Sequence, residues 1–151
     1  MAAPITQQDF PEIRWHGNWI WVSDEAITPG SPFPGTANQP AKEAHGLFRK
    51  TLHLDHVPER VPARLTADSR YALFVNEQEV FRGPIRSQPR RMHYDLFDLA
   101  PYLQPGPNVL AVYVKYYGTP KSFWMPATPN MTLGKTGILV FETDLVRLAG
   151  W

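Results

Sequence analysis

The chain has 151 residues, of which 43% are hydrophobic and 13% aromatic, and it carries a net charge of +1. A chain of this length buries about 70% of the surface that it exposes when unfolded, so we expect one domain with a real core. The small net charge argues against a surface built for nucleic acid or for acidic lipid. The sequence has no cysteine, which excludes disulfides and thiolate metal sites.

The two ends of the chain bear on its compartment and its completeness. The opening "MAAPITQQDF" has neither a basic region nor an apolar run, so we see no signal peptide and favour the cytoplasm over secretion. No apolar stretch approaches the ~20 residues that a membrane helix needs. The last residues, Gly150 and Trp151, directly follow an apolar segment. We therefore expect the natural chain to continue as a longer multidomain protein.

The 16 prolines and 10 glycines divide the chain into short segments, which favours strands over long helices. In chain order, the aromatic, β-branched or alternating segments that we expect to be strands are 14–22, 46–54, 63–68, 71–75, 80–83, 92–99, 108–118 and 137–146. Proline-rich loops are expected at 28–40 and 119–136. Asp98 is expected to cap a single helical turn that ends at Pro105 and Gly106.

Within this order, three segments carry more specific expectations. In 63–68, Leu65 and Ala67 alternate with Arg64 and Thr66, which is the pattern of a strand with one buried face. Segment 71–75 is apolar on both faces and is expected to be a central strand. Seven to nine short strands with little helix predict an all-β fold, an antiparallel jelly-roll β-sandwich in one domain.

Four stretches of the chain resemble a known family, and they occur in the family's order. They are "WHGNWIW", "FRKTLHL", "LTADSRYALFVNEQEVFRGPIRSQP" and "YDLFDLAPYLQPGPNVLAVYVKYYG", and the resemblance covers roughly Trp15 to Glu142. They are similar to the N-terminal β-sandwich of bacterial α-L-rhamnosidases and related glycoside hydrolases. Parts of the pattern are also similar to the galactose-binding-like jelly rolls of β-galactosidases. The arginine-rich loop after Arg82, followed by Tyr94 and Asp95, favours the rhamnosidase type.

The resemblance implies a parent enzyme that removes terminal α-L-rhamnose with inversion, using carboxylates on a separate helical-barrel domain. That barrel is not in these 151 residues. The resemblance thus implies a non-catalytic accessory module whose partner is the catalytic domain of the same chain, with carbohydrate as a second partner. A free-standing lectin-like module and a protein-interaction domain are the alternatives. Asn76-Glu77 replaces the Asn-Gly turn usual in the family, so we expect a turn that is longer or of another type and that includes Gln78 and Glu79.

The polar candidates each have a functional and a structural interpretation. The carboxylates Asp68, Asp95 and Asp98 have three interpretations: a glycosidase pair, a calcium site or turn caps. We favour turn capping, because no calcium-loop pattern is present. The arginines of the loop bind nucleic acid, or they form a fork for sugar hydroxyls or for a carboxylate of a neighbouring domain, or they bond loop carbonyls and Asp68 or Asp95 and hold an irregular connection. We favour the last role or the contact with a neighbouring domain. The four arginines are Arg82, Arg86, Arg90 and Arg91.

The aromatic candidates are expected to dock a sister domain before they bind free sugar. Trp19 and Trp21 lie at period two in the first expected strand, where paired tryptophans are most often core or interface. Phe123 and Trp124 lie in a proline-flanked loop, a better place for binding or docking. We expect no catalytic residue, no cofactor and no metal. The five histidines, His16, His45, His53, His56 and His93, are expected at the surface.

Overall fold

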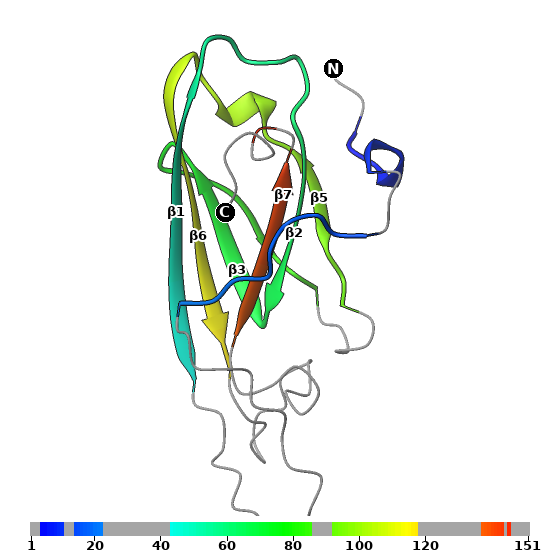
Figure 1. Cartoon of the computed structure of the whole chain (residues 1–151), viewed down its shortest axis with the longest axis vertical. Helices are drawn as coiled ribbons and strands as arrows, with labels where there is room; N and C mark the ends of the chain where they lie inside the picture. The colour runs from blue at the N-terminus through cyan, green and yellow to red at the C-terminus, as the bar shows by residue number, and fades with distance from the viewer. Residues whose placement is uncertain are drawn as a thin grey trace, which may run out of the picture.

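The computed structural model describes residues 4–10, 14–22, 43–85, 92–117, 137–143 and 145. In this part of the chain seven strands form two antiparallel sheets (Figure 1). One sheet has the strand order β1-β6-β3-β4 and the other β5-β2-β7. The strands are β1 (Ala44–Leu54), β2 (Pro62–Asp68), β3 (Arg70–Val75), β4 (Gln78–Gly83), β5 (Asp95–Asp98), β6 (Gly106–Tyr116) and β7 (Ile138–Thr143). The predicted all-β sandwich is confirmed.

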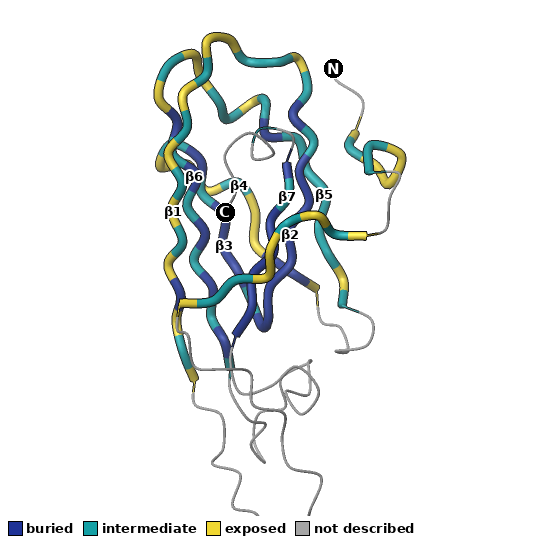
Figure 2. The backbone as a smooth tube through the Cα atoms, viewed as in Figure 1, coloured by how far each residue is buried: buried dark blue, intermediate teal, exposed yellow. Residues whose placement is uncertain are grey.

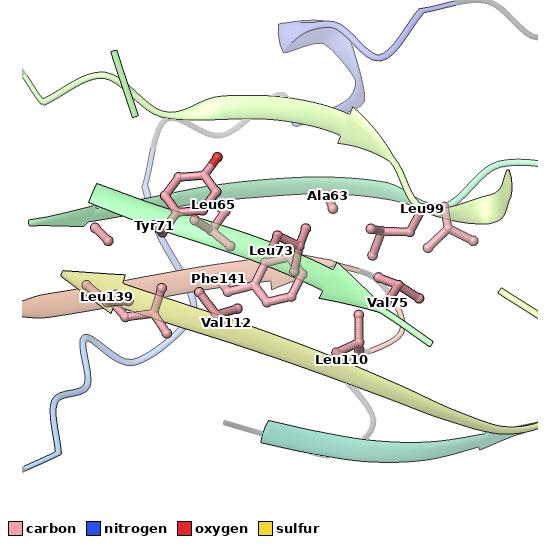
Figure 3. Packing of buried hydrophobic residues seen from close by; sticks show 13 residues of the cluster. Ala63, Leu65, Tyr71, Leu73, Val75, Leu99, Leu110, Val112, Leu139 and Phe141 are labelled. Atoms are coloured by element: carbon pink, nitrogen blue, oxygen red, sulfur yellow. The ribbon is translucent and has the colours of Figure 1, made fainter. Parts of the chain in front are cut away.

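The core fills the space between the two sheets. Leu65 of β2 and Leu139 of β7 face Leu73 of β3 and Val112 of β6, and all four side chains are fully buried (Figure 3). Alternate residues of each strand supply this layer, as the period of a strand requires. The predicted central position of segment 71–75 is confirmed, because β3 pairs with β6 on one side and with β4 on the other.

The chain changes sheets between β2 and β3. Asp68 ends β2, Arg70 begins β3, and the peptide bond between Asp68 and Ser69 is cis. The backbone N–H of Ser69 donates to the carbonyl of Lys115 in β6, at 3.1 Å. This link joins the two sheets at one end of the sandwich.

The expected first strand at 14–22 is wrong. This segment crosses the second sheet as an irregular strap (Figure 1), with a single β-bridge between Ile20 and Leu139. The strap covers the outer side of β2, which is why Figure 2 shows β2 dark blue along most of its length. Arg64 and Thr66, expected to face solvent, are therefore buried. The alternation in β2 correctly predicted its buried inner face, but it did not predict that the strap covers the outer face.

The β3–β4 turn is shorter than expected. Val75 pairs with Gln78, so only Asn76 and Glu77 connect the strands, and both have positive φ, 49° and 68°. Two central residues with positive φ define the turn that matches the twist of a hairpin. The Asn76 side chain holds this geometry: its Nδ2 donates to Asn108 Oδ1 at 2.8 Å and its Oδ1 accepts from Val109 N at 2.9 Å. The expectation of a longer turn is therefore wrong.

The remaining elements differ from expectation mainly in length. The expected strand 92–99 is reduced to β5, Asp95–Asp98. The single helical turn is present as the 3-10 helix η2 (Ala100–Tyr102), and it ends before Pro105 and Gly106. The N-cap residue is Leu99, with no side-chain capping bond, so the expectation that Asp98 is the cap is wrong. Asp98 lies one residue earlier, and its Oδ1 accepts from Ala100 N at 3.0 Å. A second 3-10 turn, η1 (Gln7–Asp9), lies in the N-terminal segment and was not expected. The hairpin of β3 and β4 forms one side of its sheet, with β4 at the edge and not at the centre.

Candidate functional site

The outer face of the four-stranded sheet carries a groove with a volume of about 340 Å³. Ala72 of β3 lies in register with Tyr113 of β6 and with Arg82 of β4, so a methyl group stands between two long side chains. This difference in side-chain size hollows the sheet surface. The groove is lined by Arg70, Tyr71, Ala72, Arg82, Gly83, Tyr113, Lys115 and Tyr117.

Three cations from three strands line this groove. The Arg82 guanidinium forms a two-pronged contact with Glu79, Nε to Oε1 at 2.7 Å and Nη2 to Oε2 at 2.6 Å. Lys115 Nζ lies 2.9 Å from Glu43 Oε1. Arg70 donates to the backbone carbonyl of Pro84. Two carboxylates therefore accompany three cations.

The protonation states of these ion pairs are fixed around neutral pH. The hydrogen bond from Arg82 lowers the pKa of Glu79, and the hydrogen bond from Lys115 lowers the pKa of Glu43. The same hydrogen bonds raise the pKa of Arg82 and of Lys115. Both carboxylates stay ionised and both cations stay protonated, so the groove keeps its charge.

Aromatic rings border the cations. Tyr113 stacks on His45 of β1 with ring centroids 5.7 Å apart, and its hydroxyl lies 2.5 Å from His45 Nδ1. Lys115 Nζ lies 5.6 Å from the centre of the Tyr117 ring. The groove thus combines positive charge with apolar ring surface. Tyr113, Lys115 and Tyr117 alternate along one segment, a signal that was present in the sequence and was missed. Arg70 and Arg82 join them only when β3 pairs with β6 and with β4.

A second polar cluster lies under the strap, on the other sheet, around Arg64. Its side chain is 2% exposed, and its Nε and Nη2 contact Glu142 Oε2 at 2.7 and 2.5 Å. Nη2 also donates to the carbonyl of Arg14 at 2.8 Å. The guanidinium carbon lies 4.5 Å from the Trp15 ring centre and 4.9 Å from that of Phe10. This buried ion pair fixes the strap to the sheet.

The structure separates the two tryptophans that were expected to act together. Trp19 is 47% exposed and touches Trp15, with ring centroids 6.1 Å apart. Trp21 packs against Phe48 and Tyr116, at 6.0 and 6.2 Å. Trp21 is therefore part of the sandwich packing, whereas Trp19 leaves much of its ring surface exposed.

The arginine loop is only partly described. Arg82 lies in β4 and is exposed, and it pairs with Glu79; among the described residues it makes no bond to a loop carbonyl, to Asp68 or to Asp95. Arg70 of β3 bonds the Pro84 carbonyl, at the start of the loop. The other candidates of the loop and of the proline-flanked segment lie outside the described residues. They are Arg86, Arg90, Arg91, Phe123 and Trp124.

The three candidate carboxylates bond to their own scaffold. Asp98 Oδ1 accepts from Val61 N at 2.8 Å and from Ala100 N at 3.0 Å. Asp95 Oδ2 accepts from the Tyr71 hydroxyl at 2.6 Å, and burial raises the pKa of Asp95. Asp68 accepts from the Ser69 hydroxyl at 2.7 Å, and burial raises the pKa of Asp68 to about 6. These contacts fit the structural interpretation of all three residues.

The histidines are all exposed, as expected. Among the described residues no group of three or more His, Asp or Glu side chains could hold a metal ion. In the same part of the chain we find no helix with the length and apolar character needed to span a membrane.

Comparison with known proteins places this sandwich in context. No family model and no curated protein matches the chain. Among solved structures, the GH78 family rhamnosidase of Bacillus sp. GL1 is 30% identical and superimposes with a TM-score of 0.63. The chain is similar to one domain of an α-L-rhamnosidase. The match covers 87% of this chain and 12% of the Bacillus enzyme.

A second rhamnosidase has the same fold with less sequence similarity. The native α-L-rhamnosidase of Aspergillus terreus is 23% identical, with a TM-score of 0.54, and the match covers 75% of this chain and 13% of that one. The predicted resemblance to the α-L-rhamnosidases is thus confirmed at the level of one domain. This chain spans about an eighth of the enzymes that it matches.

Proposed function

We propose that this chain is a non-catalytic accessory module of an α-L-rhamnosidase-like glycoside hydrolase, and that it supports a catalytic domain on the same parent chain. One observation carries the proposal: nearly the whole sandwich, 87% of this chain, matches only 12% of the rhamnosidase of Bacillus sp. GL1. The module would thus contribute one part of a larger enzyme that acts on terminal α-L-rhamnosides.

The contacts of the candidate carboxylates support a role without catalysis. Hydrolysis with inversion needs a carboxylic acid and a carboxylate about 6.5–9.5 Å apart across a sugar pocket. Asp68, Asp95 and Asp98 instead bond to Ser69, to Tyr71 and to backbone N–H groups. Their side chains hold turns and strand ends together.

Exposed apolar side chains support docking against another domain. Trp19 is 47% exposed and Val22 52% exposed, and both belong to the strap. Large exposed apolar groups mark surfaces that bind a partner when they lie close together. The strap is therefore our choice for the surface that contacts the catalytic domain.

The experiment measures binding of a hydrophobic dye to the isolated chain, together with its activity on an aryl α-L-rhamnoside. We expect dye binding that falls in the Trp19→Ser variant, and no hydrolysis. Leu47→Ser is the matched control, because Leu47 is exposed on the other sheet. A monomeric chain that binds no dye would contradict docking through the strap, and rhamnoside hydrolysis by the isolated chain would contradict the accessory role.

A further inference from the structure

The groove on the four-stranded sheet has the size of a small-molecule site. Its volume of about 340 Å³ lies within the range of about 300–1,000 Å³ that is common for ligand pockets. Its floor is Ala72, and its sides are long side chains from β3, β4 and β6. These strands are held in register by ladders on both sides of β3, so the groove rests on the rigid part of the sandwich.

The charges of the groove point to an anionic group with the shape of a carboxylate. Arg82 already holds one carboxylate in a fork, that of Glu79, and Lys115 holds that of Glu43. Both of these carboxylates come from residues that do not line the groove. Arg70, the third cation, bonds a backbone carbonyl. These contacts position the three cations before a ligand binds. A ligand carboxylate would bond to the N–H groups that the contacts leave over, and charge-assisted bonds of this kind are the strong ones.

The aromatic side chains of the groove indicate what kind of molecule would carry that carboxylate. Tyr113 and Tyr117 line the same groove as the three cations. A tyrosine offers an apolar ring face together with a polar hydroxyl, which suits a molecule with both apolar and hydroxyl surfaces. A sugar ring has both, whereas a free inorganic anion has no apolar face to place against the rings.

We propose that this groove binds a uronate residue of an oligosaccharide, with Arg70, Arg82 and Lys115 facing its carboxylate and the two tyrosines facing its ring. The choice of a sugar as the carrier of the carboxylate rests on the proposed function, and the inference deepens that function by naming the class of glycan. The module would then select acidic glycans for the enzyme that carries it.

The test titrates the chain with trigalacturonate, with the methyl ester of the same trisaccharide, and with inorganic phosphate. Binding is measured by calorimetry and by backbone amide shifts in β3, β4 and β6. We expect trigalacturonate to bind and to shift groove amides, and the ester and phosphate to bind at least about tenfold more weakly, since each lacks one of the two features. Equal binding of the ester, or of phosphate, would overturn the proposal.

Two arginine variants make the test specific. Arg82→Ala is expected to weaken trigalacturonate binding about tenfold or more, because it removes one of the three cations that would bond to the carboxylate. Its ion pair with Glu79 is exposed, so the fold is expected to survive. Arg49→Ala is the control: Arg49 is exposed on the same sheet face, opposite Ala111, and it does not line the groove. Unchanged binding in Arg82→Ala, or equal losses in both variants, would refute the assignment.

The outcomes separate this inference from the function on which it rests. A parent protein that hydrolyses α-L-rhamnosides while its module binds no trigalacturonate would overturn the groove assignment alone. If the chain binds trigalacturonate but belongs to no glycosidase, the groove assignment would stand and the proposed accessory function would be overturned.

Discussion

Replacing Arg64 with methionine should cost this domain much of its stability. The Arg64 side chain is 2% exposed, and that of its partner Glu142 is 13% exposed. Breaking a buried ion pair by removing one member costs about 3–5 kcal/mol, because the other charge stays buried. In the variant, Glu142 still accepts hydrogen bonds from the backbone N–H groups of His16 and Gly17. We therefore place the loss of unfolding free energy near the lower end of that range, at about 3 kcal/mol. The whole free energy of unfolding of a folded domain is only about 5–15 kcal/mol.

The measurement is urea unfolding followed by tryptophan fluorescence, to which Trp15, beside the guanidinium, contributes together with the other four tryptophans. Arg64→Met combined with Glu142→Gln is expected to recover part of the loss, since the amide leaves no buried charge. Arg82→Ala is the control, because its ion pair is exposed. A free energy of unfolding for Arg64→Met within about 1 kcal/mol of that of the unsubstituted chain would refute the reasoning.

Three further predictions follow from particular side chains. The raised pKa of Asp68, about 6, means that the folded chain holds this proton more tightly than the unfolded one. The free energy of unfolding should therefore fall by about 3 kcal/mol as pH rises from about 4 to above 6, and Asp68→Asn should remove most of that fall in unfolding curves taken across this range. Glu77→Gly should raise the melting temperature by about 2–4 °C, because Glu77 has φ 68°. A melting temperature below that of the unsubstituted chain would contradict the turn geometry. Gly83→Ala should destabilise the fold by about 1–3 kcal/mol, because a Cβ there would lie 2.0 Å from Asp95 Oδ2; an unchanged melting curve would contradict this contact.

Strand periodicity predicted the inner face of β2, and local chemistry predicted the helical turn after Asp98. Leu65 and Ala67 are buried as their alternation predicts. Asp98 Oδ1 accepts from the N–H of Ala100, the first residue of η2, because its short side chain reaches a backbone group two residues later. Both predictions depend only on neighbours in the sequence.

The errors came from contacts between segments far apart in the sequence. Arg64 was predicted to face solvent, but the strap some 50 residues earlier covers it. The Asn76-Glu77 turn was predicted to be longer, because glutamate disfavours positive φ, and the bonds from Asn76 to Asn108 and Val109 override that preference. The groove was missed for the same reason, since its lining comes together only when β3, β4 and β6 are placed side by side.

The central claim is that this sandwich is one module of a rhamnosidase-like enzyme. The most direct measurement is the size of the native protein in its source cells, by immunoblot against this domain, followed by a rhamnosidase assay on the immunoprecipitated protein. The account predicts a band far above 17.2 kDa that hydrolyses an aryl α-L-rhamnoside. A band at 17.2 kDa, or a larger protein without that activity, would contradict it.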